Sequence, residues 1–144
     1  MPSAERPVVV DATPIIALAS LGRLTLFRDL YRQVLVPEAV RRELVGGGRR
    51  AGSAEDLSAA PWIQIRRLRE PFRSRLPEDL HRGEAEVLAL AQEVDARLVI
   101  MDDRLGRREA ARRGLSVTGT VGVLLAIYLS KKLRALALEK ARET

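Results

Sequence analysis

A run of four apolar residues that ends on two carboxylates constrains the fold of this chain most strongly. The apolar segment 98–101 is followed directly by Asp102 and Asp103, and a polar segment then continues to Arg113. A short apolar run predicts a buried strand, and the polar segment predicts a helix. In an open α/β sheet the ligand cleft lies outside the carboxyl ends of the strands, so both carboxylates are expected at a functional position. The alternative is that one of them only caps the helix, because Asp is favoured at N-caps.

Strand and helix signals alternate along the rest of the chain. Strands are expected at 8–10, 33–36, 62–65, 98–101 and 115–117, and helices at 15–21, 23–31, 37–45, 83–94, 104–113, 121–133 and 135–143. Helices between successive strands predict a mostly parallel sheet with helices packed on it. Because the chain has 144 residues and no long low-complexity tract, we expect residues 1–144 to form one α/β domain.

Composition narrows the class of protein. Cysteine is absent, which excludes a disulfide scaffold and a cysteine nucleophile and is compatible with a reducing cytoplasm. The longest apolar run, residues 121–129, is far shorter than the ~20 residues of a membrane-spanning helix. The net charge is +6 and nearly all basic residues are arginine. Arginine pairs well with phosphate, so a polyanionic partner is expected; an arginine-rich surface that is merely solvated is the alternative.

Two strands of the expected sheet end on an aspartate. Asp11 and Asp102 each follow a short apolar run. Because parallel strands end at the same edge of a sheet, both carboxylates are expected at that edge. After Asp11, Thr13 is expected to cap the next helix and Pro14 to be its first residue.

The positions of residues around two predicted helices indicate two further acidic residues of the site. At ~100° per residue, Glu43 lies beside the core-facing stripe of its helix, whereas Glu38 is turned away. On the helix that opens at Gly83, Glu84 lies beside the core stripe and Glu86 is expected to face solvent. Converging carboxylates repel one another, and a hard divalent cation with oxygen ligands is the usual compensation.

The segments that carry these acids resemble the PIN domain, specifically the prokaryotic branch similar to the VapC toxins of toxin–antitoxin pairs. The resemblance rests on the ordered runs VVVDATPII, PEAVRREL, GEAEVLALA, LVIMDDRLGR and GLSVTGTVGVLL. PIN domains are Mg²⁺- or Mn²⁺-dependent ribonucleases with a sheet flanked by helices. The resemblance therefore implies a three-layer α/β/α sandwich with a central, mostly parallel sheet.

The resemblance also implies roles for particular residues. The positions expected to be catalytic are Asp11, Glu43, Glu84 and Asp102. The expected metal ligands are Asp11, Glu84, Asp102 and Asp103. Thr13 would support Asp11, and Glu86 would support Glu84, which stands where VapC-type toxins commonly carry Asp. The arginines expected to hold RNA near the cleft are Arg49, Arg50, Arg104 and Arg107.

The expected function is cleavage of single-stranded RNA in the cytoplasm by a metal-dependent hydrolase, as the toxin of a toxin–antitoxin pair. The apolar surface of residues 121–138 exceeds what one small sheet covers, which predicts a homodimer, and the resemblance implies a small antitoxin partner. A response-regulator receiver domain is set aside, because the lysine expected after a late strand has no clear match. A non-enzyme stays open: an antitoxin-like or structural interaction protein whose acids serve as caps and ion-pair partners of arginine.

Overall fold

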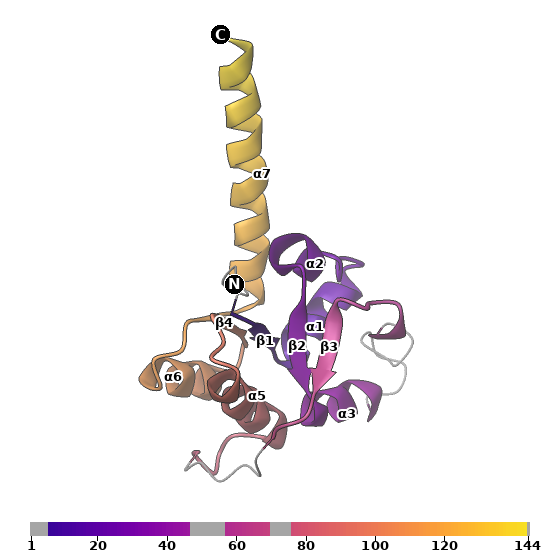
Figure 1. Cartoon of the computed structure of the whole chain (residues 1–144), viewed down its shortest axis with the longest axis vertical. Coiled ribbons are helices and arrows are strands. Elements are labelled where there is room, and N and C mark those ends of the chain that lie inside the picture. The colour runs from indigo at the N-terminus through magenta and orange to yellow at the C-terminus, as the bar shows by residue number, and fades with distance from the viewer. Residues whose placement is uncertain (1–5, 47–56, 70–75, 144) are drawn as a thin grey trace.

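The computed structural model describes residues 6–46, 57–69 and 76–143. Its strands are β1 Val8–Val10, β2 Val34–Pro37, β3 Ile63–Arg66, β4 Leu98–Ile100 and β5 Val117–Thr118. They form one sheet in the order β3-β2-β1-β4-β5, and every neighbouring pair is parallel (Figure 1). All carboxyl ends of the strands therefore lie at the same edge.

Helices pack on both faces of this sheet. They are α1 Ala12–Ser20, α2 Leu26–Tyr31, α3 Glu38–Gly46, α5 Arg82–Glu93, α6 Arg104–Arg112 and α7 Thr120–Arg142. Because crossovers between parallel strands are right-handed, this strand order places α1 and α3 on one face and α5 and α6 on the other. At the carboxyl edge of the sheet, α3 also contacts α5. The predicted three-layer α/β/α sandwich with a parallel sheet is confirmed.

Burial separates the central strands from the edge strand. All three residues of β1 and all four of β2 are buried, as expected for strands covered on both faces. In β3 only Ile63 is buried and Ile65 is exposed, so this strand lies at the edge, as its sequence predicts. Rigid central strands therefore carry the residues that follow β1 and β4.

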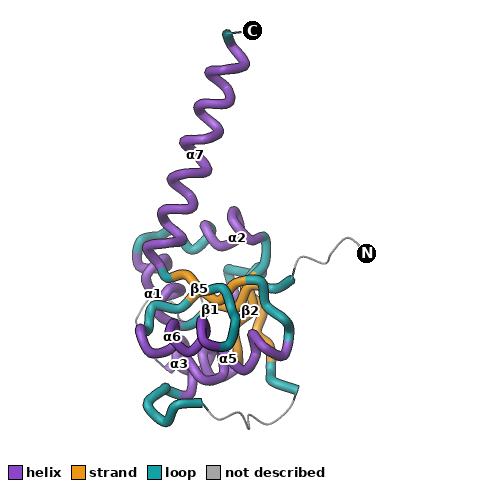
Figure 2. Tube along the Cα trace, turned by 90° about the vertical axis from the view of Figure 1, so that its left-hand side faces the viewer, coloured by secondary structure: helices purple, strands orange, loops and turns teal. Residues whose placement is uncertain are grey.

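Two sequence-based expectations about helices are wrong. The first helix starts at Ala12, with Asp11 rather than Thr13 as its N-cap, because the Asp11 carboxylate accepts a hydrogen bond from the first helical N–H. The segments expected at 121–133 and 135–143 form the single helix α7, since no glycine or proline lies between residues 123 and 142. Beyond its first turns α7 projects from the sheet (Figure 2), and from Tyr128 onwards all its described residues are exposed.

The basic loop expected at residues 46–52 lies almost entirely outside the described residues. Arg49 and Arg50 belong to that part of the chain. No helix among the described residues is long and apolar enough to cross a membrane.

Candidate active site

Asp11 is a buried acidic residue at the carboxyl end of β1. Its backbone N–H donates to the carbonyl oxygen of Ile100 in β4 at 2.9 Å, which ties the residue to two central strands. Its Oδ1 accepts a hydrogen bond from the N–H of Ala12 at 2.8 Å. The residue is only 4% exposed, and burial raises the pKa of Asp11 from its ordinary 3.8 to about 7. A carboxyl in this environment stays partly protonated at neutral pH unless a positive charge lies beside it.

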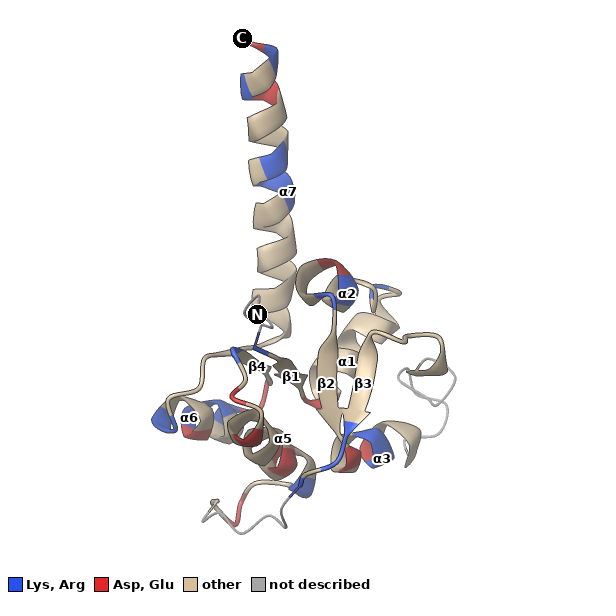
Figure 3. Cartoon of the chain, viewed as in Figure 1, with Lys and Arg blue, Asp and Glu red and all other residues tan. Residues whose placement is uncertain are grey.

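Three more carboxylates act on Asp11 at this edge. After burial, the negative charges of Glu84, Glu43 and Asp103 raise the pKa of Asp11 further. Burial also raises the pKa of Glu84, and Asp103 and Glu43 add to that rise. Figure 3 shows acidic segments in red where β1 and β4 end, beside α5 and α3. The sequence predicts that Asp11, Glu43, Glu84 and Asp102 lie together, whereas the acids whose charges act on Asp11 are Glu84, Glu43 and Asp103.

Gly83 keeps the space between these acids open. A Cβ atom at this position would lie 2.8 Å from Oε2 of Glu43 and 3.9 Å from Oδ1 of Asp11. Glycine at the second residue of α5 therefore allows the Glu43 carboxylate to approach Asp11. The next residue, Glu84, accepts a hydrogen bond through Oε2 from the N–H of His81 at 2.8 Å, which fixes it at the start of α5.

The aspartate doublet after β4, Asp102 and Asp103, has two different sets of hydrogen-bond partners. Asp102 directs both oxygens at the start of α7, accepting from the N–H of Thr120 at 2.8 Å and from its hydroxyl at 2.5 Å. Asp103 is the N-cap of α6, accepting from the N–H of Gly106 through Oδ2 at 2.7 Å. The charge of Asp103 also raises the pKa of Asp11 and of Glu84, so Asp103 is close enough to act on both acids.

Glu86 does not face solvent, which corrects the expectation from helical phase. Its side chain is only 13% exposed. Oε1 accepts from the N–H of Ala39 in the first turn of α3 at 3.3 Å, and Oε2 accepts from Nε of Arg82 at 3.2 Å. The packing of α3 against α5 covers this side of the helix, and helical phase alone does not predict that contact.

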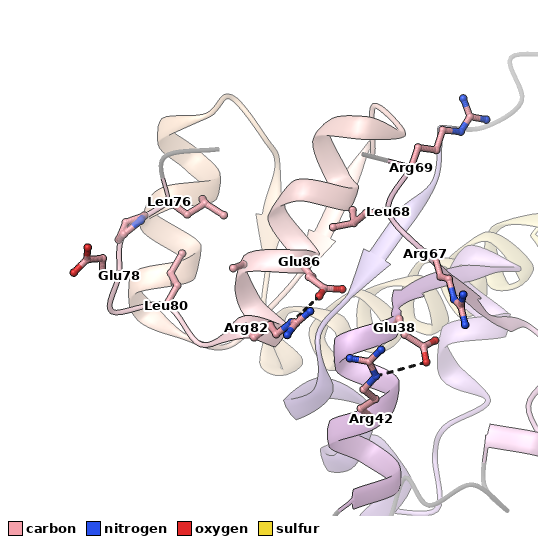
Figure 4. A pocket seen from close by; sticks show the side chains of 12 residues that line it. Glu38, Arg42, Arg67, Leu68, Arg69, Leu76, Glu78, Leu80, Arg82 and Glu86 are labelled. Atoms are coloured by element: carbon pink, nitrogen blue, oxygen red, sulfur yellow. Dashed lines mark hydrogen bonds and ion pairs between the residues drawn. The ribbon is translucent and has the colours of Figure 1, made fainter. Parts of the chain in front are cut away.

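Glu38 and Glu86 line a pocket of about 870 Å³ together with Arg42, Arg67 and Arg82 (Figure 4). Glu38 forms ion pairs with Arg42 and with Arg41, the latter at 2.5 Å. Glu38 and Glu86 already have cationic partners, and Glu78, the third carboxylate of the lining, points away from both of them (Figure 4). This pocket therefore fits a metal ion less well than the acids around Asp11.

The remaining expected site residues lie on the surface. Thr13 is exposed on the first turn of α1. Arg104 and Arg107 are exposed on α6. A Cβ atom on Gly119 would lie 2.5 Å from Oδ1 of Asp102 and 2.9 Å from Nη1 of Arg107, so the Arg107 guanidinium lies next to the doublet.

A family model described as PIN domain matches residues 7–143. The chain belongs to the PIN domain family. A PilT N-terminus domain protein from the hyperthermophilic archaeon Sulfolobus solfataricus P2 has a similar fold, with a TM-score of 0.65 and 15% identity over 83% of this chain and 91% of that one. The search of curated proteins gives no match. PIN domains are generally nucleases and generally use divalent metal ions.

The acids of this PIN domain fit a divalent cation in charge and donor type. Asp11, Glu43, Glu84 and Asp103 supply hard oxygen donors, and the raised pKa values of Asp11 and Glu84 show that positive charge would stabilise them. Among the described residues, no three acidic or histidine side chains are close enough to hold a metal ion. Glu43 is exposed and Glu84 half-buried, so these longer side chains would have to move inwards to complete a site.

Two uncharged residues that shape this PIN site, Gly83 and Thr120, are not among the site residues predicted from the sequence. Gly83 is predicted only as a helix start, although a glycine directly before Glu84 also indicates a close approach of another group. Thr120 has no role in the predicted site, although its N–H and hydroxyl donate to the two oxygens of Asp102. Thr120 follows Gly119 and begins the apolar helix. Gly119 has no side chain to cap this helix, so the free N–H groups of its first turn indicate that another residue must accept from them.

Proposed function

We propose that this PIN domain is a Mg²⁺- or Mn²⁺-dependent ribonuclease that cleaves single-stranded RNA. The observation that carries the proposal is the state of Asp11, whose burial and acidic neighbours raise its pKa to about 7. A protein retains a buried, repelling group of this kind most readily where a cation neutralises it. Such an edge, at the carboxyl ends of parallel strands, is where α/β folds commonly place their ligands.

The acidic residues of the site have different roles in the proposed reaction. A divalent cation bound here would supply an activated water and would stabilise charge on the leaving oxygen. Asp11 and Asp103 would hold it from rigid positions, because each is fixed by a helix cap. Glu43 and Glu84 would approach it from α3 and α5. Asp102 is a positioning residue, since its hydrogen bonds to Thr120 tie the β4 end to α7.

RNA would approach over basic residues on neighbouring elements. Arg104 and Arg107 project from α6, which starts directly after Asp103. Guanidinium groups there can pair with the phosphates that flank the bond to be cleaved. Arg49 and Arg50 remain candidates from the sequence alone. Thr13, exposed beside Asp11 in the chain, is proposed to hold a water at the site.

The wider biological role is also proposed. The resemblance to VapC-type sequences supports a cytoplasmic toxin that is restrained by a small antitoxin. The projecting part of α7 exposes several leucines, which supports a homodimer.

One observation favours a second function, that of an inactive interaction protein on the PIN scaffold. Asp102, Asp103 and Glu86 each accept a hydrogen bond from a backbone N–H in the first turn of a helix. Glu109 is paired with Arg112 and Arg113. If such structural roles account for all the acids, no cation is required.

Calorimetric titration with Mn²⁺ separates the two functions. We expect the intact chain to bind Mn²⁺ and Asp11→Asn to lose most of this affinity, because the substitution removes the central charge. Asp29→Asn is the matched control, since Asp29 is an exposed acid on α2 paired only with its neighbour Arg28 among the described residues. Cleavage of a single-stranded RNA that stops in excess chelator and in Asp11→Asn supports the nuclease. Cleavage in chelator, or no Mn²⁺ binding by the intact chain, refutes it.

A further inference from the structure

A second pocket, of about 330 Å³, lies mainly at the amino ends of β1, β2 and β4 and is lined by arginine. Its lining includes residues just before β1, β2 and β4, one residue within each of β1 and β2, the end of α2 and the last residue of β3: Arg6, Pro7, Val8, Tyr31, Arg32, Gln33, Leu35, Arg66 and Arg97. Four of these residues are cationic and none is acidic. The volume is at the lower end of the range of ~300–1,000 Å³ that small-molecule sites occupy.

One of these arginines is held in place before any ligand arrives. Nε of Arg97 donates a hydrogen bond to the backbone carbonyl oxygen of Arg6 at 3.0 Å. Its guanidinium lies over the ring of Tyr31, 5.7 Å from the ring centroid, a cation–π arrangement. Since Nε and one face of the group are engaged, the terminal nitrogens are the donors that remain for an anion.

Two more arginines of this pocket are not neutralised. Among the described residues, neither Arg32 nor Arg66 forms an ion pair with an acid. Arg6 at the rim is paired with Asp95 at 3.4 Å, where both side chains are largely exposed. Arg32 also has a positive φ of 65° with ψ of −46°, a backbone conformation that is strained for a residue with a Cβ and is often found at functional sites.

We propose that this pocket binds a phosphate monoester, such as the terminal phosphate of a nucleotide or of an RNA strand. Guanidinium groups match phosphate oxygens in geometry and can each donate two hydrogen bonds. Three unneutralised arginines around one small pocket suit a dianionic monoester better than a diester, which carries a single charge. The proposal is independent of the ribonuclease function, because none of the acids proposed to hold the cation lines this pocket.

Calorimetric titration with AMP, and with adenosine as the uncharged comparison, tests the pocket. We expect AMP to bind the intact chain and adenosine to bind at least tenfold more weakly. The double variant Arg32→Gln with Arg66→Gln should lose at least tenfold in AMP affinity. The control is Arg23→Gln with Arg108→Gln, which removes the same charge from exposed positions outside this pocket. The single variant Arg66→Gln, on the edge strand, repeats the test if the double variant unfolds.

Two oligonucleotides of identical sequence, with and without a 5′-phosphate, separate the sources of the phosphate. Tighter binding of the phosphorylated strand, lost in the double variant, assigns the pocket to RNA ends. Binding of AMP without a difference between the two strands assigns it to free nucleotides. Equal affinity for AMP and adenosine, or an equal loss in the control variant, overturns the proposal. Mn²⁺ binding measured in the same double variant should stay unchanged, so failure here is distinguishable from failure of the nuclease.

Discussion

Gly83 and the carboxylate of Glu43 lie so close together that there is no room for a methyl group on Gly83. A Cβ atom on Gly83 would lie 2.8 Å from Oε2 of Glu43, closer than such contacts are tolerated without a shift of the side chain. The helices α3 and α5 meet at this point. The glycine is therefore part of the proposed cation site, although it carries no ligand atom.

Gly83→Ala should weaken cation binding without weakening the fold. Alanine is favoured over glycine inside a helix by up to about 1 kcal/mol, while its methyl group displaces the Glu43 carboxylate from Asp11. We expect Mn²⁺ affinity to fall at least fivefold by calorimetry and the melting temperature to stay or rise. Gly46→Ala is the control, since a Cβ atom there would meet nothing within 4 Å. A lower melting temperature with unchanged Mn²⁺ affinity would contradict this role.

Asp11→Asn should stabilise the cation-free protein at alkaline pH. The unfolded chain releases the Asp11 proton near 3.8, while the folded chain keeps it up to about 7. Rising pH across this window therefore favours the unfolded chain, by a free energy on the order of 4 kcal/mol once both states are ionised. Asparagine keeps the hydrogen bond from Ala12 and never ionises.

Thermal melts at several pH values measure this effect. We expect Asp11→Asn to melt above the intact chain at about pH 8 and at the same temperature near pH 4. Added Mn²⁺ should raise the melting temperature of the intact chain and not that of Asp11→Asn. A variant that is less stable at every pH would show that Asp11 is not under electrostatic strain.

Asp102 and Asp103 should separate into a structural and a ligand role. Asp102→Ala leaves the N–H and hydroxyl of Thr120 without their acceptor, which should cost about 1–3 kcal/mol of unfolding free energy. Asp103→Asn keeps an oxygen for the N–H of Gly106 but removes the charge that faces Asp11. We expect it to lower Mn²⁺ affinity with less than about 1 kcal/mol of destabilisation. Denaturant unfolding and calorimetry on both variants decide this, and the reverse pattern would make Asp102 the ligand.

The sequence predicted the parallel sheet because each apolar run is followed by a helix signal, and the strands β1 to β4 lie within two residues of their predicted bounds. It also predicted the edge on which Asp11, Glu43 and Glu84 converge. These features depend on local periodicity, which a sequence displays directly.

Local periodicity does not predict features that depend on contacts between elements far apart in the sequence. The burial of Glu86 comes from the packing of α5 against the start of α3, and periodicity says nothing about which polar side a second helix covers. The division between Asp102 and Asp103 depends on where the chain returns after β5 to place Thr120. The sequence predicts a catalytic Asp102 and a metal-binding role for both aspartates, whereas the hydrogen bonds from Thr120 to Asp102 follow only from the tertiary fold.

The exposed stripe of α7 should mediate dimerisation. Leu125, Leu129, Leu133 and Leu136 follow one another at intervals of three or four residues and are 48–67% exposed, which places them on one face. Leu138 is 59% exposed but lies about 180° around the helix from Leu129. We expect light scattering at micromolar concentration to show a dimer that Leu129→Glu disrupts and Leu138→Glu does not. A strict monomer, or equal effects of both substitutions, would refute this interface.

Glu84 and Glu86, two residues apart on α5, should differ in what their loss affects. Glu84→Gln keeps an oxygen that can accept from the N–H of His81, so the helix start is preserved while the charge facing Asp11 is lost. We expect Mn²⁺ affinity and RNA cleavage to fall at least tenfold, with little change in melting temperature.

Glu86→Gln should show the opposite pattern. Its amide can replace one carboxylate oxygen toward Ala39 but cannot accept from Arg82 with the other, so about 1 kcal/mol of stability should be lost. Mn²⁺ affinity should stay within about twofold, because the side chain points toward α3 rather than toward Asp11. Calorimetry and thermal melts on both variants form the test. Equal losses of Mn²⁺ affinity would mean that both glutamates reach the cation, and a larger loss for Glu86→Gln would mean that the start of α5 rearranges when the cation binds.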